Sequence, residues 1–259
     1  MRVLVVSPYI APEGGGQGKI VWMTSKKLAE RGYDVTIVSA TREAPKEEDA
    51  DGVRVIRLKP DYIISNTPIK LVILKDLDAI AREAKPDAVY AHTPVPYFAD
   101  AANIVARKRG IPLLLHYHTG SLTKERPLLD FAAVAYRETA ERFLLSSAEK
   151  VIVHNPYIRD VTLAKYAKKV VVIPPGVETA RFEPPAVYPK NKLIFVGQLI
   201  SAHRMKGLSH LILAMKHLGR RQRSHAGRGW WGQYARLLHE PCKRLRGFRQ
   251  SELPRAGAE

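Results

Sequence analysis

The chain has 259 residues, of which 46% are hydrophobic and 26% charged, so it can bury a sizeable core and wholesale disorder is excluded. No apolar run approaches the roughly 18 residues of a membrane-spanning helix. The N-terminus lacks a secretory signal pattern, so we expect a cytoplasmic protein. The net charge is +17, which favours phosphorylated ligands, anionic lipid or nucleic acid as binding partners without specifying which.

Cysteine and side-chain amides are scarce. The single cysteine, Cys242, excludes an intrachain disulfide and a cysteine metal cluster. Residues 1–218 contain two Gln and four Asn. Low contents of cysteine and amide side chains are one mark of thermophilic proteins, so we hold a thermophilic origin as a hypothesis.

Strand and helix patterns alternate along the first 218 residues. This alternation predicts βαβ units and a Rossmann-like, doubly wound parallel sheet in the α/β class. The expected strands are short runs rich in Val, Ile or Leu, at 2–7, 34–39, 53–58, 87–91, 112–118, 150–154 and 170–173. The expected helices are amphipathic, one from Ile20 that closes at Gly32 and others at 69–84, 97–109, 127–147 and 157–167.

A proline-rich segment separates this unit from the rest of the chain. Residues 174–190 hold five prolines and no clear periodicity, which is typical of a linker. A new strand is expected at 192–196 and a new helix at 207–218. We therefore expect an N-terminal Rossmann-like domain over residues 1–185 and the truncated start of a second Rossmann-like domain over 186–218.

The last segment, residues 219–259, differs in composition from everything before it. It holds nine Arg, one Lys and three Glu, so it contributes +7 of the net charge, and it lacks apolar periodicity. One interpretation is a genuine basic tail that binds RNA or lipid. We favour a non-native or disordered segment, such as the product of a frameshift. A clean reading frame ending at Glu259 in related genomes would count against that interpretation.

A glycine-rich loop, Gly14-Gly15-Gly16-Gln17-Gly18, lies between the first strand and the first helix. There a doubly wound sheet presents free backbone N–H groups and the positive end of a helix dipole, which suit a phosphate or a sugar hydroxyl. The P-loop pattern fails, because Glu13 stands where its first Gly belongs and Ile20 where it needs Ser or Thr. The dinucleotide pattern G-x-G-x-x-G fails as well. A tight turn without a ligand is the alternative.

Three histidines lie at the carboxyl ends of expected strands, where open α/β sheets bind ligands. His92 follows the strand 87–91, and His116 and His118 end the strand 112–118. His116 and His118 share one face of that strand, which invites a metal interpretation. No carboxylate pattern supports it, so we predict no metal site. A structural histidine in the core is the alternative for His92 and for His118.

Several blocks of sequence, in one order, resemble family-four glycosyltransferases of the GT-B fold. No single block is decisive, but their joint occurrence over residues 1–218 is specific. The blocks are the glycine loop, DAVYAH at 87–92, LLHYH at 114–118, KVIV at 150–153, VIPPGVE at 172–178, FEP at 182–184, and FVGQL at 195–199 with KG at 206–207.

The resemblance implies a retaining hexosyl transfer from a nucleotide-diphosphate sugar to a carbohydrate or lipid-linked acceptor, with no further cofactor. The N-terminal domain would bind the acceptor and close over a donor held mainly by the second domain. His118 would be catalytic, with its imidazole hydrogen-bonded to the transferred sugar near the reacting carbon. The residues implied to bind substrate or phosphate are Gly15, Gly16, Gly18, His92, Arg204 and Lys206.

The sequence departs from the family pattern at three places. Gln198 stands where the family has an Arg, and a neutral amide cannot clamp a diphosphate, which leaves Arg204 as the candidate replacement. Pro175 stands where the family has Asn. The family's second domain, with its paired glutamates, does not continue after Leu218. We therefore expect a truncated, inactive or weakly active form.

Two other functions remain open. The chain could be a non-catalytic binding module that needs a partner carrying a donor domain. A nucleic-acid-binding protein ranks last, because the scattered arginines of the tail form no recognised fold. The basic charge makes peripheral association with the inner membrane surface plausible. The exposed interface of an orphaned domain and an unpaired strand at 192–196 would promote aggregation.

Overall fold

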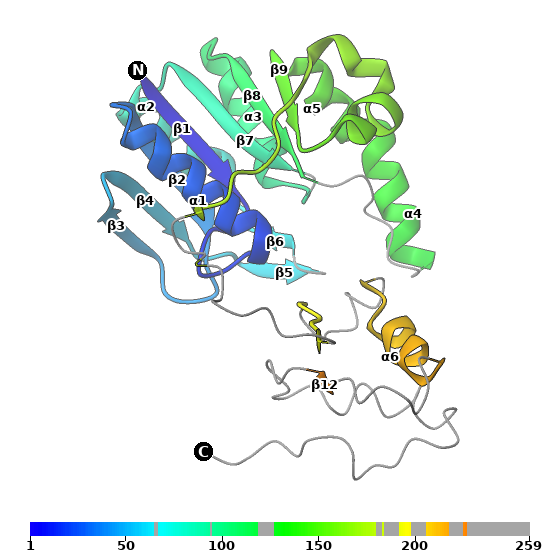
Figure 1. The fold of residues 1–259 in the computed structure, drawn as a ribbon. Coiled ribbons are helices and arrows are strands. Elements are labelled where there is room, and N and C mark those ends of the chain that lie inside the picture. The colour runs from blue at the N-terminus through cyan, green and yellow to red at the C-terminus, as the bar shows by residue number, and fades with distance from the viewer. Residues whose placement is uncertain are drawn as a thin grey trace. The chain divides into compact units, whose positions relative to one another are not determined.

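The computed structural model describes residues 1–64, 67–93, 95–118, 127–179, 183, 192–197, 206–217 and 225–226 (Figure 1). The chain divides into two compact units, Met1–Val177 and Glu178–Glu259. The division falls inside the proline-rich segment 174–190. Each unit is described by itself below.

One eight-stranded sheet forms the centre of the first unit. Its strands are parallel except for β3, which runs antiparallel to β4 at one edge. The strand order β10-β9-β8-β7-β1-β2-β4-β3 extends in both directions from β1, so the expected doubly wound, Rossmann-like sheet is confirmed. The strands are β1 Arg2–Ser7, β2 Asp34–Ala40, β3 Lys46–Ala50, β4 Val53–Leu58, β7 Ala88–Thr93, β8 Leu113–Tyr117, β9 Lys150–Val153 and β10 Val170–Val172.

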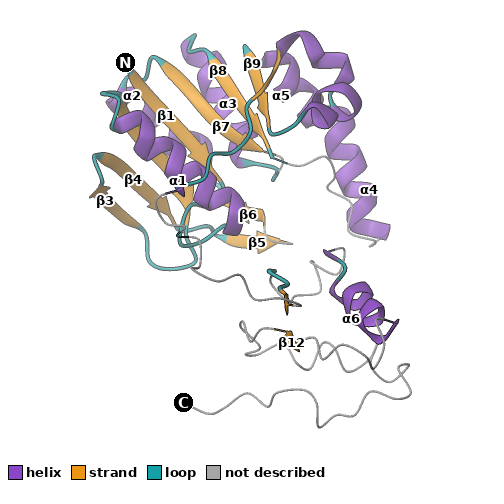
Figure 2. Ribbon diagram, viewed as in Figure 1, coloured by secondary structure: helices purple, strands orange, loops and turns teal. Residues whose placement is uncertain are grey.

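Helices cover both faces of this sheet (Figure 2). On one face, Val3, Val5 and Tyr90 pack with α1. On the other face, Leu4 and Val6 belong to the core formed with α2, α3 and α5. The alternation along β1 follows from the two-residue period of a strand, and both sets are apolar because both faces are covered. The helices are α1 Gly15–Ala29, α2 Ile73–Ala84, α3 Phe98–Arg109, α4 Pro127–Tyr136 and α5 Arg142–Ser147.

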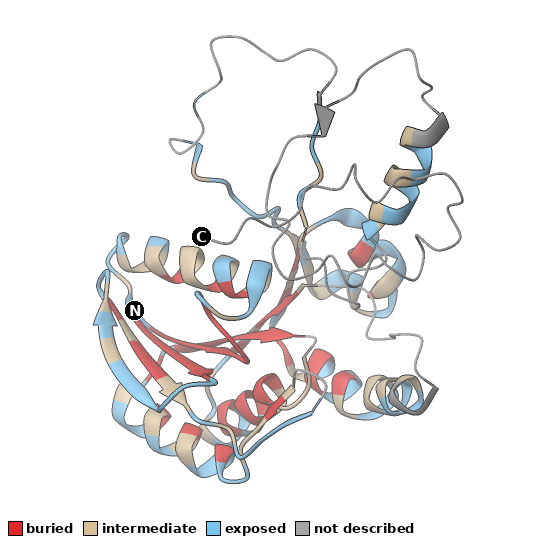
Figure 3. Ribbon diagram, turned by 90° about the horizontal axis from the view of Figure 1, so that it is seen from below, coloured by how far each residue is buried: buried red, intermediate tan, exposed pale blue. Residues whose placement is uncertain are grey.

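Buried residues of the first unit gather on the strands and on the helix faces turned toward them (Figure 3). Edge strand β3 is different, since none of its residues is buried. Its sequence, Lys-Glu-Glu-Asp-Ala, carries no apolar signal, and the sequence analysis therefore missed it. A charged edge strand protects a sheet from pairing with other chains.

Two expected helices differ from the structure: one begins later than expected, and the other is interrupted in its middle. The helix expected at 69–84 begins at Ile73, because residues before it form a hairpin of β5 Tyr62–Ile64 and β6 Thr67–Ile69. The helix expected at 127–147 is interrupted by one π-helical turn at Arg137–Glu141. This turn lies where Glu141, itself buried, accepts a hydrogen bond from the Tyr117 hydroxyl at 3.1 Å.

The short helix expected at 157–167 is present as two irregular helical turns. The structure has a π-helical turn at Ile158–Thr162 followed by a 3₁₀ helix at Ala164–Lys169. Ile158 and Leu163 both belong to the core of the first unit.

In the second unit the structure describes the helix α6 Leu208–His217 and a pair of short strands, β11 Lys192–Leu193 and β12 His225–Ala226. The expectation of an unpaired strand at 192–196 is wrong, since the strand ends at Leu193 and pairs in parallel with β12. A strand extends only as far as its partner offers backbone groups, and β12 offers two residues. Within the described residues, no helix is long and apolar enough to cross a membrane.

Candidate functional site

The glycine loop, residues 14–18, connects β1 to α1 by a turn that leaves no room for a side chain at Gly14 or at Gly18. Gly14 has a φ of 77°, and a Cβ at this position would lie 2.7 Å from the Cβ of Tyr9. A Cβ on Gly18 would lie 2.2 Å from the backbone oxygen of Glu13. The Gly18 N–H donates to the Gly14 oxygen at 3.1 Å. Gly18 is also buried, so it packs on the inner side of the loop.

Gly15 and Gly16 lie on the open side of the same turn. Both are exposed, and a Cβ on either would meet no atom within 4 Å. The N-cap of α1 is Gly14, which has no side chain to occupy the first N–H groups, and the first turn holds no acidic residue. The amides of an uncapped helix start need partners, and the helix dipole favours an anionic one. The loop therefore offers an anion or a hydroxyl an accessible row of donors.

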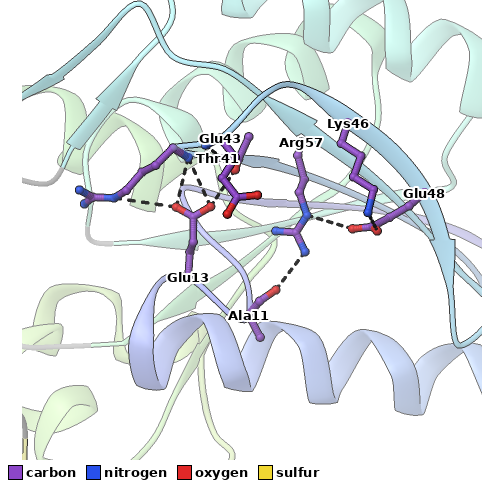
Figure 4. A network of polar contacts seen from close by, with 8 residues as sticks. Ala11, Glu13, Thr41, Glu43, Lys46, Glu48 and Arg57 are labelled. Atoms are coloured by element: carbon purple, nitrogen blue, oxygen red, sulfur yellow. Dashed lines mark hydrogen bonds and ion pairs between the residues drawn. The ribbon is translucent and has the colours of Figure 1, made fainter. Parts of the chain in front are cut away.

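Glu13 anchors this loop to the end of β2 (Figure 4). Its carboxylate accepts a hydrogen bond from the Thr41 hydroxyl at 2.8 Å and from the Arg42 backbone N–H at 3.3 Å. The Arg42 guanidinium lies 3.8 Å from the same carboxylate. The acidic side chain next to the glycines is thus turned toward β2 and does not fill the anion site.

Arg57 anchors the loop from β4 (Figure 4). Its Nη2 donates to the Ala11 oxygen at 3.0 Å, and its Nε donates to Glu48 at 3.1 Å. Contacts with Lys46 first, and with Arg57 second, lower the pKa of Glu48. Sequence reasoning did not single out Arg57, because nothing in the run 53–58 shows that its partner lies 46 residues earlier.

Four histidines come together at the carboxyl ends of β7, β8 and β9. His92 stands opposite His116 in the β7–β8 register, and His118 and His154 each follow the last residue of their strands. We call His92, His116, His118 and His154 the histidine cluster. His92 lies two residues after Tyr90 on β7, so the two side chains share one face of the sheet. Tyr90 belongs to the core that packs with α1, so the histidine cluster lies on the face that α1 covers elsewhere.

Hydrogen bonds join three of these imidazoles in a row with His118 in the middle. His92 Nδ1 lies 2.9 Å from His118 Nε2, and His118 Nδ1 lies 3.0 Å from His154 Nε2. His116 takes a different partner, since its Nδ1 lies 2.6 Å from the Tyr90 hydroxyl. Its ring stacks on His118 with the ring centres 4.3 Å apart.

Burial keeps these imidazoles neutral. It lowers the pKa of His116 to about 3, and neighbouring His154 adds to the shift. Burial, followed by the effects of His116 and His154, lowers the pKa of His118 to about 2. Burial also lowers the pKa of His92 well below its usual value. A neutral imidazole donates through one nitrogen and accepts through the other. The two hydrogen bonds between His92, His118 and His154 therefore point the same way along the row.

The structure brings some predicted site residues together and leaves others apart. His92 and His118 are in hydrogen-bond contact. The glycine loop lies at the same edge of the sheet, because it follows β1, which pairs in parallel with β7. His154 was missed, although its place at the end of the expected strand 150–154 was a signal equal to that of His92.

Two predicted residues belong to the second unit. Lys206 is exposed and precedes α6, and a Cβ on Gly197 would lie 3.4 Å from its Cδ. Lys206 thus lies beside the segment that follows β11. Arg204 and Gln198 lie outside the described residues.

The sequence profile of Glycosyltransferase Family 4 matches residues 14–181. The match begins in the glycine loop and contains the whole histidine cluster. It covers well over half of the chain.

Curated relatives are longer than this chain. The chain is 32% identical over 183 residues to O-antigen chain mannosyltransferase C of Escherichia coli, covering 69% of this chain and 46% of the relative. It is 26% identical over 250 residues to D-inositol 3-phosphate glycosyltransferase 1 of Catenulispora acidiphila, covering 91% of this chain and 56% of the relative. The chain thus spans about half the length of the curated relatives it matches.

Solved structures share the fold. Anabaena Alr3699/HepE, solved in complex with UDP, superposes with a TM-score of 0.57 at 17% identity over 95% of this chain and 66% of that one. A glycosyltransferase from Rickettsia africae superposes with a TM-score of 0.54 at 15% identity over 85% of this chain and 58% of that one. These likenesses support the GT-B assignment of the fold.

Proposed function

Because the chain belongs to Glycosyltransferase Family 4, we propose that it is the acceptor-side part of an enzyme that transfers a hexosyl group from a nucleotide-diphosphate sugar. One observation carries the proposal. The glycine turn at the start of α1 is open, and His118 is neutral and partly accessible. Both follow strands of one sheet and lie at its carboxyl edge. Donors for a phosphate and for a sugar hydroxyl thus lie at the edge where such sheets bind ligands.

Each residue has a role that its surroundings suit. The exposed amides of Gly15 and Gly16 bind a phosphate or the acceptor, while Gly18 holds the turn in place. His118 exchanges one of its two imidazole partners for the transferred sugar near the reacting carbon, and stabilises the charge that develops there during retaining transfer. His92 acts through His118, with which it shares a hydrogen bond. No cofactor beyond the donor substrate is required.

The second unit supplies the remaining charge. Lys206, exposed before α6, neutralises the leaving diphosphate, with Arg204 as the candidate replacement for the missing clamp at Gln198. We retain domains over 1–185 and 186–218, followed by a non-native or disordered tail at 219–259. Because the chain spans about half the length of its curated relatives, we expect little or no transfer from it alone.

The acceptor is a carbohydrate or a lipid-linked sugar. The names of the relatives support this range, since one acts on an O-antigen chain and others on inositol phosphate. Exposed apolar side chains on and after the β5–β6 hairpin, Tyr62, Ile64 and Leu71, together with a net charge of +17, support peripheral binding at the cytoplasmic membrane surface. Co-sedimentation with anionic vesicles that does not weaken in salt would argue against this charge-based binding.

A restored enzyme tests the proposal. Residues 1–185 are fused to the donor domain of the Escherichia coli relative, and the fusion is assayed with the common nucleotide sugars. We expect transfer from at least one of them, and far slower transfer from the present chain, since both domains must enclose the donor. A folded fusion that transfers no sugar from any donor would contradict the proposal. Activity recovered only with a copurifying partner chain would instead favour the binding-module alternative.

A further inference from the structure

The histidine cluster holds more ring nitrogens than the sugar-binding role uses. His92, His116 and His118 each offer one ligand nitrogen, and these three atoms lie within 4.8 Å of one another. They come from two neighbouring strands, β7 and β8. Sequence reasoning saw only the pair on one strand and predicted no metal site. The third imidazole comes from His92, which stands opposite His116 in the register.

Two ring nitrogens of these three histidines are buried without a partner. His92 is fully buried and His116 is 5% exposed, and the Nε2 of each lacks a hydrogen-bond partner among the described residues. Polar atoms that are buried and unpaired are unfavourable, and each one in a native structure calls for an explanation. An ion bound to His116 Nε2 would satisfy that nitrogen.

The opposite nitrogens are already held by other groups. His116 Nδ1 lies 2.6 Å from the Tyr90 hydroxyl, and His118 Nδ1 lies 3.0 Å from His154 Nε2. Metal-binding histidines typically engage their second ring nitrogen in such a hydrogen bond, which fixes the tautomer and the ring orientation. The Nε2 of His116 is therefore the nitrogen left for an ion, and His118 Nε2 and His92 Nδ1, which share one hydrogen bond, would exchange it for the ion.

From this geometry we propose that His92, His116 and His118 bind one first-row transition-metal ion, with Zn²⁺ as the reference case. Three imidazoles and no thiolate or carboxylate suit Zn²⁺, Co²⁺, Ni²⁺ or Cu²⁺ and disfavour Mg²⁺ and Ca²⁺. Tetrahedral Zn²⁺ with Zn–N bonds of about 2.0–2.1 Å needs nitrogens about 3.3 Å apart. His92 Nδ1 and His118 Nε2 are already 2.9 Å apart, so His116 makes the main adjustment.

If His118 has the role given under the proposed function, an ion bound to it affects sugar transfer. Metal bound to His118 Nε2 replaces its hydrogen bond to His92 and keeps this nitrogen from the sugar. Transfer by the restored enzyme is therefore inhibited by Zn²⁺, and added chelator reverses the inhibition. A site with three protein ligands leaves a fourth position for water.

Zinc titration of the full chain tests the site without any assay of sugar transfer. Calorimetry and metal analysis after dialysis are expected to show one Zn²⁺ per chain in this site with micromolar or tighter affinity. X-ray absorption is expected to show three imidazole nitrogens at about 2.0 Å. Fewer than three imidazoles around the tightest-bound ion would overturn the proposal.

Variants separate this site from the other histidines of the chain. His118→Gln and His116→Gln are each expected to weaken the site by at least about 100-fold, and Tyr90→Phe by about 10- to 100-fold through the outer hydrogen bond. His210→Gln, on α6 of the second unit, is the matched control and is expected to bind as the parent does. Unchanged affinity in a folded His118→Gln chain overturns the proposal. This holds even if His116→Gln fails to fold by circular dichroism.

Discussion

Gly16 and Gly18 lie two residues apart in one loop, and their surroundings differ. A Cβ on Gly16 would meet nothing within 4 Å, whereas one on Gly18 would lie 2.2 Å from the Glu13 oxygen. The sequence could predict the loop and its place before α1. It could not separate a glycine that faces solvent from one that packs against backbone, because that depends on the path of residues 9–13.

Alanine substitutions at these two positions form a matched pair. Gly18→Ala is expected to lower the free energy of unfolding by about 1–3 kcal/mol, since the new methyl group overpacks the loop against backbone. Gly16→Ala is expected to change it by less than about 0.5 kcal/mol, the usual range for a surface substitution. Urea denaturation followed by circular dichroism measures both. Equal stabilities would show that Gly18 is not required by packing.

The buried histidines predict a pH dependence of stability. Burial lowers the pKa of His116 to about 3 in the folded state, against about 6.5 in the unfolded chain. The unfolded state then binds more protons between these values, so stability is complete above about pH 6.5 and falls as the pH falls toward 3. The slope is about 1.4 kcal/mol per pH unit for each such histidine.

Urea denaturation at pH 7 and pH 5, with chelator present, measures this slope. His116→Gln is expected to flatten it, because the variant has no proton to gain at this position. A parent chain and a His116→Gln variant with the same loss of stability at pH 5 would contradict the neutral, buried state of His116.

At the scale of elements, apolar runs predicted the parallel strands well. Strands β1, β2 and β7 are buried on both faces and are mostly apolar, and β1 carries an unbroken run of Val and Leu. The charged edge strand β3 and the π-helical turns gave no such signal. The turn at Arg137–Glu141 depends on contacts with other elements, such as the bond from Tyr117 on β8 to Glu141. A local pattern does not contain such partners.

Arg57 links β4 to the glycine loop, and its removal is expected to loosen that loop. Arg57→Ala takes away the hydrogen bond to the Ala11 oxygen, so amide exchange in residues 14–18 should accelerate while the sheet stays protected. Arg57→Met keeps the apolar stem and serves to separate lost packing from the lost hydrogen bond. Hydrogen exchange read by mass spectrometry reports both variants. Unchanged exchange in the loop of Arg57→Ala would show that the anchor is not needed.

At the scale of the whole molecule, the family was recognisable from several short blocks in order. The profile match over residues 14–181 confirms it. Pairing of β11 with β12 removes one of the two expected causes of aggregation, the unpaired strand. A thermophilic origin remains a hypothesis, and a melting temperature in the ordinary mesophile range would count against it.

The most direct test of the account is the effect of His118 on sugar transfer in the restored enzyme. His118→Ala is expected to lower kcat by at least about 100-fold, because the hydrogen bond it removes acts where charge develops. The control, Tyr157→Phe, alters a side chain that is 67% exposed and should leave kcat unchanged. A His118→Ala enzyme that folds and transfers sugar as fast as the control would contradict the assignment of this site.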